Sequence, residues 1–135
     1  DYVENHPGLA QRLWLRDHIK QIDDTKAKSK LKVLSSSKSG KSGFNANLVC
    51  MDEIAEWPKH SARDVWDRLQ DAGAARKNAL LVTISTAQFD KTHLGYEVYR
   101  KAKQILTGQD DDLHVMPVIY EVEKHDDWRN PENWW

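Results

Sequence analysis

Two short apolar runs interrupt a largely polar chain and predict two buried strands. The first run, residues 48–51, lies between turn-forming residues at 43–45 and Pro58. The second run, residues 80–87, is rich in β-branched residues and ends in hydroxyl-bearing and small residues. Because neither run alternates apolar with polar positions, both patterns favour strands buried on both faces of a parallel sheet.

Apolar residues at helical spacing predict two helices between and after these strands. Residues 61–73 begin with a capping-box-like pair, Ser61 and Asp64, and end at a glycine. A second helix is predicted over residues 92–107, with Gly108 as its stop. Strands that alternate with helices in this way predict an α/β fold with a mainly parallel sheet flanked by helices.

The ends of the chain carry weaker patterns. Residues 7–24 are predicted to be helical, because their apolar residues include a helical stripe and Pro7 suits a first turn. A short strand is predicted at 31–34, followed by a Ser/Gly/Lys-rich loop at 35–43. A last strand is predicted at 115–122, at the edge of the sheet because Pro117 cannot donate a ladder hydrogen bond.

Composition excludes several classes of protein. The chain has 135 residues, a net charge of −1 and 30% charged residues, which fits one partial domain and argues against a basic nucleic-acid binder or an acidic tail. Its single cysteine, Cys50, lies in a predicted core strand, so no internal disulfide is expected and a reducing cytoplasm fits. No apolar run approaches the roughly 20 residues that span a membrane.

Two adjacent carboxylates, Asp52 and Glu53, follow the first strand directly. The carboxyl ends of parallel strands form the edge where α/β sheets bind ligands. There an Asp can hold a magnesium shell and the next Glu can orient and deprotonate a water, as in the Walker B strand of nucleotide hydrolases. The same pattern is also typical of a core strand that ends in a solvated acidic turn.

Ser85 and Thr86 end the second strand and predict a further polar contribution to the same edge. In additional-strand ATPases, the strand beside Walker B often ends in a polar residue that senses the γ-phosphate. Taken alone, a Ser-Thr pair at a strand end is more often part of a turn or a helix N-cap.

Several motifs, in order, resemble those of tailed-phage terminase large subunits. Residues 43–58 resemble the Walker B region of that family, and residues 74–76 leading into 81–87 resemble its coupling motif. Further similar segments follow at 95–97, 118–121, 126–128, 130–132 and Trp134. The resemblance covers roughly residues 30 to 135.

The resemblance implies a partial P-loop NTPase fold of the additional-strand type. Residues 1–122 then correspond to the central and C-terminal part of a terminase ATPase domain, and residues 123–135 to the start of a linker toward a nuclease domain. Neither that nuclease domain nor a Walker A loop is found in this sequence. We therefore expect a fragment or remnant of a larger protein that is inactive by itself.

The resemblance also implies roles for individual residues. Asp52 is the expected magnesium residue and Glu53 the catalytic base. Coupling and γ-phosphate sensing are expected from the end of the second strand, at Thr83, Ser85 and Thr86. Arg76 lies where the resemblance also places a basic residue, and a contact with a phosphate or a neighbouring subunit is one interpretation. A solvated arginine at a helix end is the default interpretation.

The cofactors and partners follow from the family as well. The intact protein is expected to use ATP and Mg²⁺ to package double-stranded DNA into procapsids. Expected partners are the portal protein, the small terminase subunit and further large subunits in a homo-oligomeric ring. The expected location is the cytoplasm of the bacterial host, with no membrane association.

The segment 37–42 ends in Gly-Lys-Ser and imitates the end of a phosphate-binding loop. A P-loop needs another glycine five residues before the Gly-Lys pair, and position 35 is Ser35. The lysine, Lys41, must also begin a helix. The few residues that separate Lys41 from Asp52 leave no room for a helix before the strand. The sequence therefore predicts no P-loop here.

Two alternatives stay open at this point. A helicase-like DNA translocase also has an Asp-Glu strand followed by a strand ending in Ser, Thr and Ala, although Trp57-Pro58 favours a terminase. The other alternative is a non-catalytic α/β remnant in a prophage.

Four scattered histidines lack metal-ligand spacing, so surface positions or local hydrogen bonds are expected for His60, His93, His114 and His125.

Overall fold

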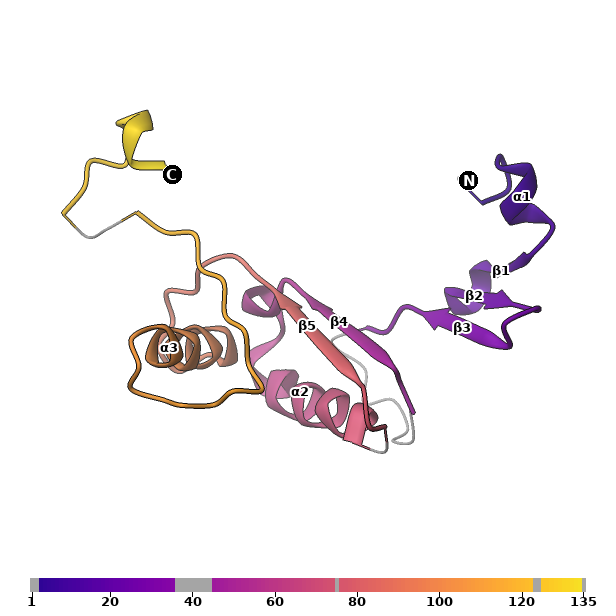
Figure 1. The fold of residues 1–135 in the computed structure, drawn as a ribbon, viewed down its shortest axis with the longest axis horizontal. Helices are drawn as coiled ribbons and strands as arrows, with labels where there is room; N and C mark the ends of the chain where they lie inside the picture. Colours follow the sequence, from indigo (N-terminus) through magenta and orange to yellow (C-terminus); the bar gives the residue numbers. More distant parts are fainter. Residues whose placement is uncertain (1–2, 36–44, 75, 123–124, 135) are drawn as a thin grey trace. The chain divides into compact units, whose positions relative to one another are not determined.

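The computed structural model describes residues 3–35, 45–74, 76–122 and 125–134 (Figure 1). The chain divides into two compact units, Asp1–Ser42 and Gly43–Trp135. The first contains a three-stranded antiparallel sheet, and the second a two-stranded parallel sheet with two long helices. The parallel pair and its helices confirm the predicted α/β class.

The first unit is a β-meander with short helical pieces. Its strands pair in the order β1-β2-β3, and the strand predicted at 31–34 begins two residues earlier. The elements are α1 (Pro7–Ala10), β1 (Leu13–Arg16), the 3₁₀ turn η1 (Asp17–Ile19), β2 (Gln21–Asp24) and β3 (Ser29–Lys32).

The helix predicted over residues 7–24 is therefore wrong beyond its first turn. The apolar residues that suggested a helical stripe are cross-strand partners instead: Leu15 lies opposite Ile22, and Ile22 opposite Leu31. Lys20 adopts a left-handed backbone (φ 51°) that lets the chain reverse between β1 and β2. A tight reversal and cross-strand packing thus override the helical spacing.

The second unit alternates strand and helix as the sequence predicts. β4 and β5 are parallel, with Leu48 opposite Leu80 and Asp52 opposite Ile84. The elements are β4 (Leu48–Asp52), the 3₁₀ turn η2 (Ile54–Glu56), α2 (Lys59–Ala74), β5 (Leu80–Ile84), α3 (Leu94–Leu106) and η3 (Pro131–Trp134). In the part of the chain that the structure describes, neither helix is long and apolar enough to cross a membrane.

Both long helices begin near their predicted starts. The predicted capping box of α2 is nevertheless wrong, because the helix begins at Lys59 and the Ser61 hydroxyl donates to the carbonyl of Pro58 at 3.3 Å. At the other end of α3, Gly108 has the left-handed φ of 69° expected of a helix stop.

The core of the second unit lies between the strands and α2. Buried residues of β4, η2 and α2 form it, and half-buried neighbours from β5, both long helices and the adjoining loops surround them. The buried members are Val49, Met51, Ile54 and Ala72, and the neighbours are Ala46, Trp57, Trp66, Leu69, Leu81 and Val98.

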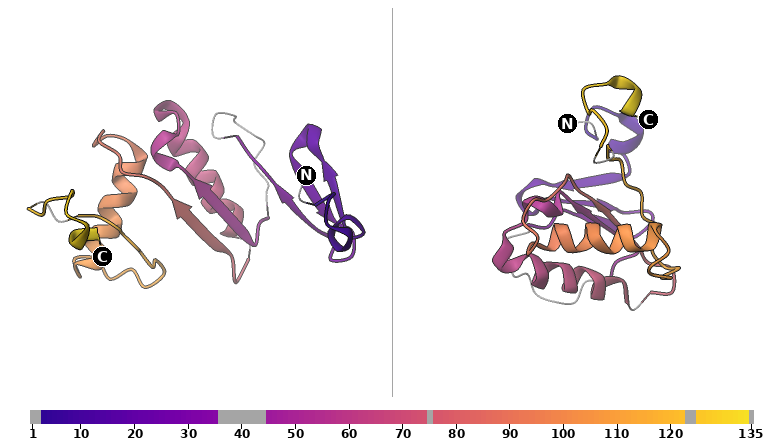
Figure 2. Two further views of the ribbon diagram at one scale, coloured as in Figure 1. Left: turned by 90° about the horizontal axis from the view of Figure 1, so that it is seen from above. Right: turned by 90° about the vertical axis from the view of Figure 1, so that its left-hand side faces the viewer.

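Only one face of the parallel pair is buried, so the prediction of burial on both faces is wrong. Val49 and Met51 are buried, whereas Leu48, Cys50 and Ile84 are exposed. The helices α2 and α3 lie on the same side of the strands (Figure 2). Within the described residues of the second unit, no other element covers the second face, and Cys50 is exposed rather than in the core.

The strand predicted at 115–122 is also wrong. These residues follow α3 as an extended segment without a ladder partner, and most of their side chains, such as Tyr120, are exposed. Pro117 cannot donate to a ladder, which removes one of the bonds that a strand needs. Side chains tie the segment to α3 instead: the Tyr99 hydroxyl donates to Glu121 at 2.7 Å.

Candidate functional site

The carboxyl ends of β4 and β5 bring the predicted residues together. Because Asp52 lies opposite Ile84 in a parallel pair, the residues that follow both strands lie at one edge. There the Thr86 hydroxyl donates to Oε2 of Glu53 at 3.2 Å. The contact joins residues 33 positions apart, so the two sequence segments meet as predicted.

Glu53 starts a sharp turn directly after β4. Its backbone is left-handed, with φ 48° and ψ 47°, a conformation that costs a non-glycine residue about 1–2 kcal/mol. The chain then enters the 3₁₀ turn η2, and the indole N–H of Trp57 donates back to the carbonyl of Asp52 at 2.9 Å. We call residues 53–57 the acidic turn. Its strained first residue needs support from its surroundings.

The loop between β5 and α3 provides part of that support. The Ser85 hydroxyl accepts a hydrogen bond from the Ala55 N–H at 2.9 Å, and the Gln88 side-chain amide donates to the Ala55 carbonyl at 2.7 Å. Ile54 and Ala55 are themselves buried. Both backbone groups of Ala55 are therefore satisfied by side chains from one loop.

The same loop is held in place by Asp90. Its carboxylate accepts bonds from the N–H and the hydroxyl of Thr92 and from Lys59 at the start of α2. These bonds hold the pKa of Asp90 well below its usual value. The bond from the Thr92 hydroxyl contributes most, and the bond from Lys59 comes next. The Asp90 N–H in turn donates to Gln88. The loop is thus ordered by polar contacts that reach back to α2.

The N-terminus of α3 supports the acidic turn from a second side. His93 is buried, with 6% of its surface exposed, and one ring nitrogen, Nε2, lies 2.9 Å from the Trp57 carbonyl. The other, Nδ1, accepts the N–H of Gly95 at 3.0 Å. The histidines were expected to make local hydrogen bonds, and His93 does so. The long-range bonds of His93 and Gln88 were not predicted, since they depend on tertiary contacts.

Two predicted residues lie away from this edge. Thr83 lies within β5 opposite Met51, half-buried on the face that the helices cover. Arg76 precedes β5, where its guanidinium Nε donates to the side chain of Asn45 at 2.6 Å. Since Asn45 precedes β4, Arg76 lies at the amino ends of the strands, opposite the edge that carries Glu53.

The Gly-Lys-Ser segment at 40–42 lies outside the described residues. Among the residues that the structure describes, no group of three or more His, Cys, Asp or Glu side chains could hold a metal ion. The edge instead offers the exposed carboxylates of Asp52 and Glu53. Such a set can contribute to a metal site only together with ligands from elsewhere.

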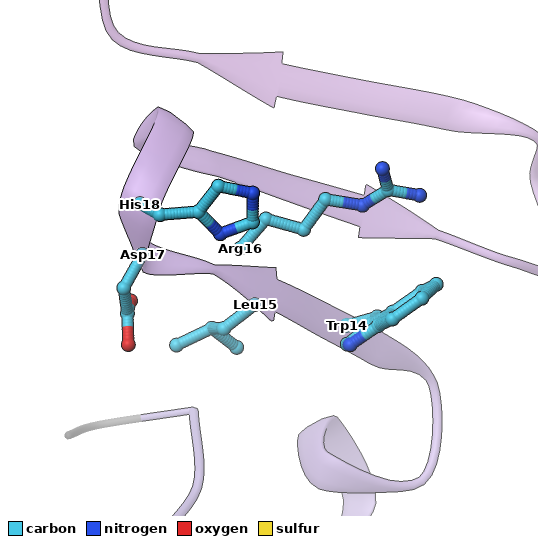
Figure 3. Close-up of a pocket in the computed structure, with 5 residues that line it drawn as sticks. All are labelled: Trp14, Leu15, Arg16, Asp17 and His18. Atoms are coloured by element: carbon cyan, nitrogen blue, oxygen red, sulfur yellow. The ribbon is translucent and has the colours of Figure 1, made fainter.

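An open hollow in the first unit holds none of these residues. Five consecutive residues of β1 and η1 line it: Trp14, Leu15, Arg16, Asp17 and His18 (Figure 3). The guanidinium of Arg16 lies over the Trp14 ring at 4.6 Å, and its Nε lies 2.7 Å from Asp23. These contacts hold Arg16 within the first unit, which contains none of the residues that the sequence predicted for a site.

Comparisons with known proteins place these features in context. A sequence model described as the terminase large subunit, ATPase domain matches residues 10–104, well over half of the chain. The crystal structure of the HK97 bacteriophage large terminase is similar in fold, with a TM-score of 0.78 and 23% identity. That match covers 98% of this chain but only 26% of the terminase. No curated protein matches the chain.

Proposed function

Because this chain belongs to the family of terminase large-subunit ATPase domains, we propose that it contributes the hydrolytic part of an ATP site in a complete large subunit. The observation that supports this most directly is the hydrogen bond from Thr86 to Glu53 where β4 and β5 end. It links a carboxylate that can activate water to a hydroxyl on the neighbouring strand. Through such a pair, the presence of the γ-phosphate of a bound nucleotide can affect the position of the catalytic carboxylate.

In this role Glu53 is the catalytic base and Asp52 the magnesium residue. The exposed Glu53 carboxylate is free on its Oε1 side to orient and deprotonate a water. Mg²⁺ favours oxygen ligands, keeps several waters and commonly uses one or two carboxylates plus substrate phosphates, so the exposed Asp52 fits it without a complete protein cage. The ion, when bound with ATP, would neutralise phosphate charge.

The hydroxyls after β5 have different roles in this proposal. Thr86, which contacts Glu53, senses the γ-phosphate, and Ser85 transmits its position to the acidic turn through Ala55. Thr83 supports the end of the strand from the helix-covered face. Arg76, at the opposite ends of strands that span about 16 Å, contacts a neighbouring subunit rather than a phosphate of this site.

The wider function is that of the packaging motor. The chain spans about a quarter of the length of the solved terminase, so the complete protein supplies the rest of the ATP site. With ATP and Mg²⁺, the intact large subunit would move double-stranded DNA into procapsids in the bacterial cytoplasm. A ring of large subunits, the portal protein and the small terminase subunit would be its partners, and residues 123–135 would lead toward a nuclease domain.

The two alternatives make different demands. A helicase-like translocase is not favoured, because the matching family is that of terminases. A non-catalytic remnant would have an open reading frame without any phosphate-binding loop upstream of Asp52. Finding a Walker A sequence about 60 to 100 residues before Asp52 would support the motor, and its absence would support the remnant.

The central test uses the complete large subunit. Glu53→Gln keeps the shape and the bond to Thr86 but removes the base, so ATP should still bind while turnover falls about 100-fold or more. Asp52→Asn should weaken magnesium-dependent ATP binding as well as turnover. Glu56→Gln, which changes an exposed carboxylate of the same turn, is the matched control and should change neither. Parental turnover in Glu53→Gln would refute the assignment.

The coupling residues are tested by DNA-dependent turnover. Ser85→Ala and Thr86→Ala should leave ATP affinity largely intact and separate hydrolysis from DNA movement. The chain of 135 residues alone should hydrolyse no ATP above background, because it lacks the β- and γ-phosphate loop. Magnesium-dependent turnover by this chain that Lys41→Ala abolishes would show that the Gly-Lys-Ser segment does bind phosphate.

A further inference from the structure

We propose that His93 is a positioning residue for Glu53, acting through the Trp57 carbonyl at the end of the acidic turn. The inference rests on the proposed function, since it gives the position of Glu53 its importance. His93 is the N-cap residue of α3 and lies 40 positions after Glu53 in the chain. It joins the first turn of that helix to the turn that carries the catalytic base.

The hydrogen bonds of His93 select one tautomer of its ring. The Gly95 N–H can only donate, so Nδ1 must carry a lone pair. The Trp57 carbonyl can only accept, so Nε2 must carry the proton. Both contacts together require the neutral ring in its Nε2–H form. One buried side chain thus caps α3 and anchors the acidic turn at the same time.

The acidic turn has little stability of its own. Its 3₁₀ helix η2 spans three residues and closes with the bonds Glu56 N–H to Glu53 carbonyl and Trp57 N–H to Ile54 carbonyl. A helix this short does not persist alone, and the left-handed Glu53 adds strain. The turn therefore depends on the groups packed around it.

Those groups hold the turn at two points. Ala55, in its middle, is bonded by Ser85 and Gln88, and α3 packs so closely that a Cβ on Gly95 would lie 3.1 Å from Ala55 Cα. Trp57, at its end, is bonded by His93. Loss of the His93 bond leaves the end of the turn held only by Trp57 itself, through its indole bond to Asp52 and its packing on the core. Glu53 can then relax toward ordinary φ values and move its carboxylate.

Two substitutions separate the two functions of the ring. His93→Asn places an acceptor near the site of Nδ1 and keeps the helix cap, but the new side chain is too short to reach Trp57. His93→Gln places a donor near the site of Nε2 and keeps the bond to Trp57, but loses the cap. His60→Asn is the matched control, because His60 is an exposed histidine in the first turn of α2.

The activity experiment measures kcat and ATP affinity in the complete large subunit. A misplacement of about 1 Å can cost about 100-fold in rate, so His93→Asn should lower kcat about 10- to 100-fold with ATP affinity within about 2-fold. His93→Gln should recover most of the rate despite a lower melting temperature. In a Glu53→Gln background, His93→Asn should add no further loss. His60→Asn should behave as the parent.

The outcomes distinguish the two proposals. If Glu53→Gln keeps the parental rate, the proposed function fails. If Glu53→Gln is inactive but His93→Asn turns over at the parental rate, or loses as much ATP affinity as rate, the positioning role alone is overturned. The positioning role is also overturned if His93→Gln has a lower kcat than His93→Asn.

A structural readout is independent of activity. In the chain labelled with ¹⁵N-histidine, NMR at neutral pH should give a protonated Nε2 and an unprotonated Nδ1 for His93, assigned by its loss in His93→Asn. An Nδ1–H tautomer or a doubly protonated ring at neutral pH would overturn the proposal, because neither can make both bonds.

Discussion

The acidic turn and the segment after α3 (residues 107–122) are both irregular, yet they are held in different ways. In the turn, Ile54 is buried and backbone groups are bonded by Ser85, Gln88 and His93. In the segment, ion pairs at the surface of α3 are the main side-chain contacts: Lys101 with Asp110 at 2.6 Å, and Lys103 with Glu121.

The difference teaches how each region should respond to its environment. Apolar burial and bonds shielded from water are little affected by salt. Exposed ion pairs contribute about 0–1 kcal/mol each and are screened by ions. The turn should therefore be rigid under most conditions, as a site for a positioned base requires, while the segment should loosen readily.

Truncating one apolar side chain in each region should give the largest contrast. Ile54→Ala removes a side chain that is 1% exposed and should lower the free energy of unfolding of the second unit by about 2–5 kcal/mol. Leu113→Ala, at a residue that is 95% exposed, should change it by less than about 0.5 kcal/mol. Urea unfolding followed by helical circular dichroism measures both. Similar effects of the two variants would break the comparison.

Gly95→Ala should have the next largest effect. The added Cβ would lie 3.1 Å from Ala55 Cα and 3.4 Å from its nitrogen, so backbone must shift by a few tenths of an ångström. We expect a net loss of about 1 kcal/mol, because overpacking outweighs the better helix propensity of alanine. Thermal unfolding measures the loss. If Gly95→Ala is more stable than the parent, the acidic turn can shift to accommodate the added methyl group at little cost.

Salt should separate the two regions without any mutation. At about 1 M salt the screening length falls to about 3 Å, so backbone hydrogen exchange should accelerate in residues 107–122 and stay unchanged in residues 53–57. Lys101→Met, which removes the partner of Asp110 and Asp112, should reproduce the acceleration at low salt. Equal acceleration in both regions would contradict the distinction.

Acid should release the segment in a defined range of pH. The Lys103 ammonium, and next the Tyr99 hydroxyl, lower the pKa of Glu121 below its ordinary value of 4.5. The stabilisation by Glu121 is therefore complete above about pH 4.5 and is lost as pH falls through the lower folded value. Hydrogen exchange as a function of pH should show this loss, and Glu121→Gln should abolish the dependence. If hydrogen exchange in Glu121→Gln still depends on pH in this range, Glu121 is not the group responsible.

Asp90→Asn should have the smallest effect. Bonds from Thr92 and Lys59 lower the pKa of Asp90, so its contribution is present above its unfolded value near 3.8 and disappears on further acidification. The variant should melt slightly below the parent at neutral pH and together with it in strong acid. The difference is small because both Lys59 and Asp90 are exposed. A constant difference at all pH values would contradict the assignment.

The second unit was largely predictable from its sequence. Apolar runs and helical spacing predicted β4, α2, β5 and α3, because each of these patterns extends over enough residues to select one periodicity. The meeting of Glu53 and Thr86 also followed, since parallel strands bring their carboxyl ends to one edge. The roles of Asp52, Glu53 and the hydroxyls stay predictions.

The failures come from short segments with competing patterns. Residues 7–24 allowed both a helical stripe and a period-two alternation, and the left-handed Lys20 selected a meander. Residues 115–122 had the composition of a strand, but no strand in the described chain pairs with them. The exposure of Cys50 was missed because a run of apolar residues does not reveal whether a second layer is present.

By itself, the sequence determined the α/β class, the order of the elements in the second unit and the edge at which the acidic residues lie. Periodicity and the geometry of parallel strands are local properties that one chain segment can express. Only the tertiary structure decided that Ser85, Gln88 and His93 hold the acidic turn. Those bonds join groups 30 to 36 positions apart, so they form only once the loop after β5 and the start of α3 pack against the turn.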